Sequence, residues 1–301
     1  MNTPRFERSF CVTIDLDDLR FYRAIHALAP ADDFPVIFVA AVPRFLAFCD
    51  RIGVRATLFA IAEDLRWPEA REALRSAAGA AHEVASHSFS HAYDLCRHDP
   101  DRMVQDLSRA RAALEDAIGS AVVGFRAPGY NLSAALLRAI AQTGHRYDAS
   151  ILPSPAYFAA RATVIGAIRL RGRRSASIVG RARDFLRSRD PFFWRNYEPA
   201  LLEFPITACG LLRWPFIGTT LARGGVLATR LATLANRLPF VQVEFHALDF
   251  LDLREDRLDA DLSVEPALRV PLADRLAHFE TAMRTAMAGH RPRLLRDLAA
   301  I

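Results

Sequence analysis

The chain has 301 residues, of which 51% are hydrophobic and 24% charged. This length suits one large or two small globular domains, and this composition excludes an intrinsically disordered protein. The formal net charge is +5, and every cationic side chain apart from histidine is an arginine, which reflects either a coding bias or the binding of phosphate or carboxylate groups.

No stretch of the sequence approaches the roughly 20 apolar residues that span a bilayer, and the N-terminus lacks the apolar core of a signal peptide. We therefore expect a cytoplasmic protein, with a peripheral position at the inner face of a membrane as an option. The cysteines have no CxxC spacing, which argues against a thiolate zinc site and against a disulfide framework. They are Cys11, Cys49, Cys96 and Cys209.

Predicted strands and helices alternate along much of the chain. Short apolar runs predict strands at 9–15, 54–60, 83–85, 122–126 and 241–245, with a strand-like turn at 147–151. Apolar residues at helical spacing predict helices at about 36–52, 68–78, 101–118, 133–144 and 272–289. This alternation is typical of βαβ units and therefore predicts an α/β fold with a parallel sheet.

Polar side chains capable of chemistry follow nearly every predicted strand, at the point where the strand ends. They are Asp15, Asp17, His87, Arg126, Asp148 and His246. Because the carboxyl ends of parallel strands meet at one edge, which is where active sites of such folds lie, we expect these side chains to form one site.

His87 and His91 lie four residues apart, and on a helical turn this spacing places both imidazoles within reach of one metal ion. Such a pair alone is a weak signal, because capping or surface histidines show it too. The Asp15-Leu-Asp17 sequence strengthens it: one carboxylate can bind the metal while the other takes a proton from water. The alternative for this acidic loop is a cap for the next helix, and Asp18 is a rival ligand.

Five short motifs, taken in their order, make the chain resemble the polysaccharide deacetylase family (carbohydrate esterase family 4, NodB homology domain). They are Asp15-Leu-Asp17, His87-Ser-Phe-Ser-His91, Gly124-Phe-Arg-Ala-Pro-Gly-Tyr130, Tyr147-Asp-Ala-Ser-Ile-Leu-Pro153 and Glu244-Phe-His-Ala-Leu-Asp249. The resemblance covers most of residues 9–155 and 241–300. It implies a distorted (β/α)7-type barrel and the hydrolysis of an N-acyl group, acetyl or formyl, from an amino sugar.

The resemblance also implies a role for each matching residue. It makes Asp15 the catalytic base, gives the metal to Asp17, His87 and His91, makes His246 the general acid and Arg126 the residue that orients the base, and lets Asp148 support Arg126 or the acid. A backbone N–H near Gly129 or Tyr130 would bind the oxyanion. Zinc is the expected metal, and cobalt, nickel or manganese would fit the same ligands. In the commonest members the two acidic residues are adjacent, whereas Leu16 separates Asp15 from Asp17, and this leaves Asp18 open as the ligand. Asp17 is favoured because a branch of the family has an acid-x-acid spacing.

Residues 153–240 interrupt the pattern, and we expect them to form a basic and apolar insertion or cap, ahead of the last motif, within a single domain of residues 1–301. Residues 161–195 hold ten arginines and two acids, and 201–240 are largely apolar. Such a cap could bind a lipid- or phosphate-linked amino sugar at a membrane surface. In the alternative, the apolar stretch packs on the barrel and its arginines face solvent.

Two further functions remain compatible with these residues. One is metal-dependent hydrolysis of another C–N amide, such as a ureide or a cyclic amide. The other is a catalytically inactive carbohydrate-binding relative. Nucleic-acid binding is not expected, because no recognisable module is present and the arginines alternate with apolar residues. The sequence leaves the sugar, the acyl group and the oligomeric state open.

Overall fold

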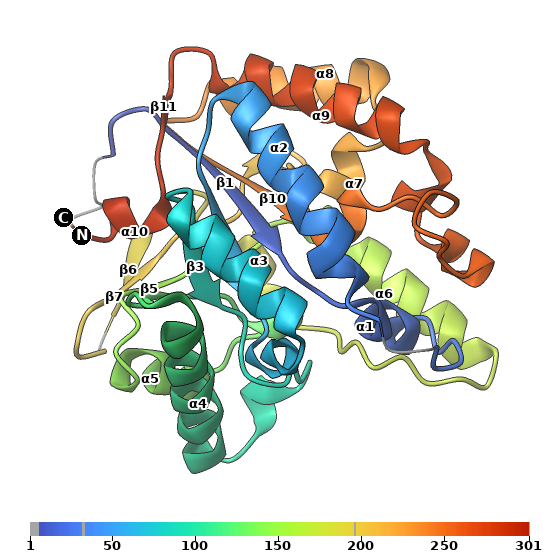
Figure 1. The fold of residues 1–301 in the computed structure, drawn as a ribbon. Helices are drawn as coiled ribbons and strands as arrows, with labels where there is room; N and C mark the ends of the chain where they lie inside the picture. The colour runs from blue at the N-terminus through green and yellow to red at the C-terminus, as the bar shows by residue number, and fades with distance from the viewer. Residues whose placement is uncertain (1–5, 32–33, 196, 301) are drawn as a thin grey trace.

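The computed structural model describes residues 6–31, 34–195 and 197–300. Residues 1–5 lie outside the described residues. The expectation that the N-terminus is not a signal peptide falls partly on them. The main feature is a curled sheet with helices packed around it, with α2, α3 and α4 in front of the sheet in Figure 1. Its strands follow the order β10 (Phe240–His246), β1 (Ser9–Asp15), β2 (Ala56–Ala60), β3 (Glu83–Ser86), β4 (Gly124–Phe125), β5 (Tyr147–Asp148), β7 (Leu201–Glu203) and β6 (Phe192–Trp194), and β11 (Arg291–Pro292) pairs with β1.

All neighbours from β10 to β7 run parallel, and only the edge strand β6 is antiparallel within the described sheet. The sheet curls back on itself, because Thr207, shortly after β7, donates a backbone hydrogen bond of 3.0 Å to Gln242 of β10. The prediction of an α/β fold of the distorted (β/α)7 barrel type is therefore confirmed.

The helices follow the strands as expected for βαβ units. Their bounds are α1 (Leu19–Ile25), α2 (Val42–Ile52), α3 (Pro68–Gly79), α4 (Pro100–Ile118), α5 (Ala134–Gln142), α6 (Pro155–Leu170), α7 (Gly218–Leu221), α8 (Gly225–Asn236), α9 (Leu272–Met287) and α10 (Leu295–Leu298). A π-helical turn at Ile37–Ala41 precedes α2, so the predicted helix at 36–52 is present in two parts. Ser133 caps α5, as its position predicted, by accepting a hydrogen bond from Leu136.

A cluster of phenylalanines fixes the position of β10, which carries part of the site. Phe45 and Phe48 of α2 contact Phe245 of β10, and Phe279 of α9 contacts the same ring at 4.9 Å between centroids. All four side chains are buried. Each such ring removes a large apolar area from water, so the face of β10 that carries Phe245 is held by packing as well as by the hydrogen bonds of the sheet.

Two predicted features differ in the structure. Residues 87–91 form an irregular loop instead of a helical turn, with left-handed φ angles of 70° at Ser88 and 56° at His91. The segment 153–240 is only partly a cover, because its strand β7 belongs to the parallel sheet. β7 is three residues long and Pro205 follows closely, so its apolar pattern is too short to identify it as a strand from sequence. No helix among the described residues is long and apolar enough to cross a membrane.

Candidate active site

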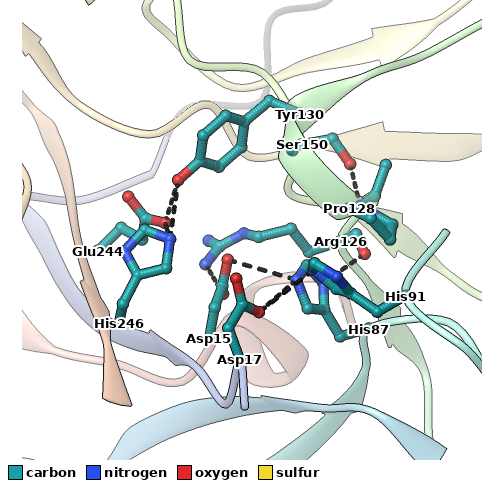
Figure 2. A network of polar contacts seen from close by, with 12 residues as sticks. Asp15, Asp17, His87, His91, Arg126, Pro128, Tyr130, Ser150, Glu244 and His246 are labelled. Carbon is teal, nitrogen blue, oxygen red and sulfur yellow. Dashed lines mark hydrogen bonds and ion pairs between the residues drawn. The ribbon is translucent and has the colours of Figure 1, made fainter. Parts of the chain in front are cut away.

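The carboxyl ends of β1, β3, β4 and β10 bring their polar side chains together, as Figure 2 shows. Asp15, the last residue of β1, lies in register with His246, the last residue of β10. Successive residues of an extended chain alternate in direction, so Asp17 points to the same side as Asp15 while Leu16 enters the core. The structure therefore assembles the predicted strand-end residues at one edge of the sheet.

Asp17, His87 and His91 form a buried cluster whose ligand atoms all lie within 4.8 Å of one another. Asp17 Oδ1 is 3.2 Å from His87 Nε2 and 3.3 Å from His91 Nε2. Two donor atoms that share one tetrahedral metal at about 2.1 Å are about 3.4 Å apart, so these separations suit a common divalent ion. Asp17 Oδ1 and both His91 ring nitrogens have no hydrogen-bond partner among the described residues, which for buried polar atoms points to a ligand.

Contacts beyond the cluster orient both imidazoles. His87 Nδ1 contacts the carbonyl oxygen of Arg126 at 2.8 Å, which places the Nδ1 proton there and leaves Nε2 as the free acceptor that a metal needs. The His91 ring packs against Phe21, at 4.3 Å between centroids, and against Tyr93. A hydrogen bond from the His91 N–H to Ser88 Oγ stabilises the loop between the two ligands.

Electrostatics keep the cluster ready for a cation. Burial by itself raises the pKa of the Asp17 carboxyl, but the two facing imidazoles hold that pKa well below its usual range. Burial lowers the pKa of His91, which favours the neutral, ligating form. Asp15 and Asp17 instead raise the pKa of His87 against the effect of its burial. An anionic carboxylate between two nitrogen donors is the donor set that zinc prefers.

The rival ligand, Asp18, has a different position. It is the N-cap residue of α1, where its side chain accepts a hydrogen bond of 2.9 Å from the Arg20 N–H. It also forms an ion pair of 3.4 Å with the Arg20 guanidinium. The helix-capping role considered for this acidic loop thus falls to Asp18, while Asp17 faces the histidines.

Arg126 is fully buried and fixes the Asp15 carboxylate. Its Nη1 donates to Asp15 Oδ1 at 2.5 Å and its Nη2 donates to Thr13 Oγ1 at 3.1 Å. Burial lowers the pKa of this guanidinium, yet Asp15 and Glu244 keep the pKa above its ordinary value, so the arginine stays charged. Because Oδ1 is occupied, Oδ2 is the Asp15 atom left to face the metal cluster, 3.8 Å from His87 Nε2.

His246 lies on the opposite side of the site, next to Glu244 of the same strand. His246 Nε2 is 3.5 Å from Glu244 Oε1, and the Tyr130 hydroxyl donates a hydrogen bond of 2.5 Å to the same oxygen. Burial lowers the pKa of His246, but Glu244, Asp17 and Asp15 raise it to about 9. The imidazole is therefore protonated near neutral pH, as a general acid must be.

Glu244 is the functional residue that sequence reasoning missed. The sequence analysis assigned no role to Glu244, which is the first residue of the last motif. Its position two residues before His246 on a strand was the available signal, because it places both side chains on one face. Burial raises the pKa of its carboxyl to about 7. Its other oxygen, Oε2, has no hydrogen-bond partner among the described residues.

Among the described residues, Asp148 forms no hydrogen bond with Arg126 or His246; its partners lie on the neighbouring strand and loop. The Ser150 hydroxyl donates to Asp148 Oδ1 and accepts from the Ala127 N–H at 2.8 Å. Glu203, its register partner in β7, brings a second buried carboxyl group next to that of Asp148. Burial raises the pKa of Asp148 to about 6 and that of Glu203 well above its usual range, so the pair shares a proton at neutral pH.

Gly129 and Tyr130 both adopt left-handed backbone angles, with φ of 59° and 61°. The left-handed φ at Gly129 favours glycine, and a Cβ there would lie 2.9 Å from the Arg161 guanidinium, which would have to shift. The Tyr130 N–H donates to the Ala127 carbonyl at 3.0 Å, whereas its hydroxyl points to Glu244. Of the two candidates for an oxyanion donor, Tyr130 therefore has its N–H already engaged.

A cavity of about 470 Å³ opens above these groups. Asp15, Asp17, His87 and His246 line its floor, while its walls are mostly aromatic and aliphatic. Tyr22, Tyr93, Tyr157 and Trp214 are among the wall residues, and Arg161 and Arg223 add two cations. Apolar walls with a few convergent polar groups are typical of a site for a small molecule rather than an open cleft for a polymer.

Comparisons with known proteins concern the fold and the central part of the sequence. The sequence profile of the family described as polysaccharide deacetylase matches residues 30–147. The fold is similar to that of a putative polysaccharide deacetylase from Mycobacterium smegmatis, with 19% identity, a TM-score of 0.58 and coverage of 100% of this chain and 92% of that one. It is also similar to the Puue allantoinase, with 14% identity, a TM-score of 0.61 and coverage of 99% and 91%. No curated protein matches the sequence.

Proposed function

Because residues 30–147 belong to the polysaccharide deacetylase family, we propose that this protein is a metal-dependent hydrolase that removes an acetyl or formyl group from the nitrogen of an amino sugar. The observation that carries the proposal is the buried cluster of Asp17, His87 and His91. The Asp15 carboxylate and the His246 imidazole flank this cluster, so a proton acceptor and a proton donor are both within the cavity.

When bound, a divalent ion supplies Lewis acidity: it acidifies a water molecule and polarises the carbonyl group of the substrate amide. Zinc is the expected ion, with cobalt, nickel or manganese as alternatives. Asp15 takes the proton of the attacking water at Oδ2, because Arg126 holds Oδ1. The water oxygen bonds to the carbonyl carbon as the C–N bond breaks, and His246 transfers its Nε2 proton to the departing amine nitrogen.

Two buried contacts prepare these groups for their roles. Arg126 keeps the Asp15 carboxylate in one orientation, which favours proton transfer through a fixed geometry. Glu244 stabilises the protonated form of His246 and is itself held by the Tyr130 hydroxyl. In this proposal Glu244 supports the acid, a role that the resemblance gave to Asp148. Asp148 and Ser150 instead stabilise the loop that carries Tyr130.

The apolar walls favour a substrate with an apolar or lipid portion over a long polysaccharide. Arg161 and Arg223 line the same cavity, and an arginine fork binds phosphate oxygens well. We therefore extend the proposal to an amino sugar linked to a lipid or a phosphate group. A peripheral position at a membrane is part of this extension and has its own test below.

The decisive experiment compares metal content with activity in Asp17→Ala and in a matched control, Asp18→Asn. Asp17→Ala removes the carboxylate that faces both histidines, so we expect the purified variant to lose bound metal and to lose amide hydrolysis about 10³-fold or more. Asp18→Asn keeps a capping side chain, so metal content and rate stay near those of the wild type. Mass spectrometry of the metal and a coupled acetate or formate assay give the two readings.

Hydrolysis that persists in Asp17→Ala, or in metal-free wild-type protein, would overturn the proposal. A substrate panel of an N-acetyl amino sugar, an N-formyl amino sugar and a cyclic ureide separates it from hydrolysis of another C–N amide. Cleavage of the ureide alone would indicate that the same metal site hydrolyses another C–N amide and not an amino sugar. Binding of sugars without hydrolysis of any of the three would indicate an inactive relative.

A further inference from the structure

A β-hairpin inside the segment 153–240 carries an apolar tip. It is formed by β8 (Ala208–Cys209) and β9 (Trp214–Pro215), which pair antiparallel. At its tip Leu211 is fully exposed and Leu212 is 70% exposed. Tight turns usually present Gly, Asn, Asp or Ser to water, so adjacent leucines at this place contribute nothing to the packing of the monomer.

The hairpin is fixed so that these leucines stay outside. Arg189 Nη1 donates to the Gly210 carbonyl at 3.0 Å, and Arg213 Nη1 donates to the Arg187 carbonyl at 2.8 Å. At its base, the Phe216 N–H donates to the Thr207 carbonyl at 2.8 Å. The tip is thus tied at both sides and cannot fold its leucines back onto the barrel without breaking these bonds.

The apolar surface continues from the hairpin to the mouth of the cavity. Trp214, directly after the tip, lines the cavity and is 44% exposed. Val164 of α6, Leu227 of α8 and Val264 line the same cavity and are also exposed. A surface on which exposed apolar side chains gather around the entrance of a site differs from the scattered apolar residues of an ordinary surface.

Two segments around the hairpin are basic, although residues 184–203 between them hold four acids. Residues 149–183 hold seven arginines and no acid, and residues 204–243 hold four arginines and no acid. Basic residues beside exposed leucines and a tryptophan suit an anionic phospholipid surface, which attracts each cation and accepts the apolar side chains between its headgroups. The combination of arginines with exposed Leu211, Leu212 and Trp214 favours an anionic membrane as the partner of this surface.

We infer that Leu211 and Leu212 insert into the headgroup region of an anionic phospholipid membrane and thereby turn the mouth of the cavity toward the lipid surface. The arginines of residues 149–183 and 204–243 meet the lipid phosphates. The inference deepens the proposed function and rests on it in one respect: the cavity that faces the membrane is the one proposed to hydrolyse the amide. Membrane binding itself does not require hydrolysis.

The test measures binding of full-length protein to vesicles of phosphatidylcholine alone and of phosphatidylcholine mixed with phosphatidylglycerol. Wild type binds the mixed vesicles, and binding weakens as sodium chloride is added. L211S weakens this binding about tenfold and the double variant L211S/L212S about a hundredfold, because each leucine transferred from water contributes about that factor. The control V39S removes an exposed valine outside the segment and leaves binding unchanged.

Neither leucine lines the cavity, so the double variant keeps hydrolysis of a soluble N-acetyl amino sugar. Asp17→Ala does the reverse: it keeps vesicle binding and loses hydrolysis, which distinguishes failure of this inference from failure of the proposed function. The inference is overturned if the wild type does not bind the mixed vesicles, or if L211S/L212S binds them as strongly as the wild type does. It is also overturned if light scattering shows that the wild type is a dimer and the double variant a monomer. The hairpin tip would then be an interface between two copies of the chain.

Discussion

At the floor of the cavity, Asp15 and His246 are the last residues of two neighbouring strands, whereas at its mouth Trp214 and Val164 come from a hairpin and a helix outside the parallel strands. At the floor, Asp15 is buried and held by Arg126, and His246 is mostly buried beside Glu244. The mouth is partly exposed and apolar. A sheet fixes reactive atoms because neighbouring strands hold each strand on both sides. Changes in the covering segments can therefore alter which substrate binds without moving the reactive atoms.

Asp15→Asn tests the floor most severely. Asparagine keeps the shape of the side chain and still accepts from Arg126, but it cannot take a proton, so kcat should fall about 10³-fold. Metal content should stay unchanged, because Asp15 is not one of the three proposed ligands, Asp17, His87 and His91. Steady-state kinetics and metal analysis check this, and a rate within tenfold of the wild type would show that another group is the base.

Glu244→Gln tests the acid half of the floor. The protonated His246 is the active form, and its pKa of about 9 keeps it protonated up to that pH; activity is therefore lost only as the pH rises through about 9. Without the Glu244 charge, the pKa of His246 falls toward about 6.5, so the rate at about pH 8 drops tens of fold while the rate at low pH changes little. A pH profile with an unmoved alkaline limb would remove Glu244 from this role.

Arg161→Met tests the link between mouth and floor. Arg161 of α6 donates from Nη1 to the Gly129 carbonyl at 2.7 Å and contacts Ser177, so it connects the cover to the loop of Tyr130. Methionine keeps the apolar stem but loses these bonds, and KM should rise about tenfold with a smaller change in kcat. Arg169→Met, an exposed residue of the same helix, is the control and should behave as wild type.

Glu203→Gln gives the smallest effect and concerns stability. Burial raises the pKa of Glu203 and of Asp148 in the folded protein, so their contribution to stability is complete below about pH 4 and is lost as the pH rises through their raised pKa values. Glutamine removes one ionisation, so the unfolding free energy should fall less steeply between about pH 4 and about pH 8. Urea denaturation at several pH values measures this, and an unchanged slope would mean that the pair does not share a proton.

Local patterns predicted much of the framework. The alternation of strands with periodic helices was enough to expect the parallel sheet, and Ser133 identified the start of α5. The same reasoning could not recognise β7, because three residues before a proline carry no distinct period. It also expected a helical turn between His87 and His91, since spacing alone does not show the left-handed angles at Ser88 and His91.

The sequence by itself determined which reactive side chains follow which strands, because alternation along a strand depends only on neighbouring residues. It left Asp17 and Asp18 as rival ligands and assigned Asp148 the support of Arg126 or the acid. Only the tertiary structure decided that Asp17 faces the histidines, because this contact joins loops far apart in the chain. Glu244 shares a strand with His246, but its contact with the Tyr130 hydroxyl also depends on the tertiary structure. The apolar mouth of the cavity was also decided by the tertiary structure. From sequence, Leu211 and Leu212 would be assigned to the hydrophobic core, and only the structure shows that they are exposed.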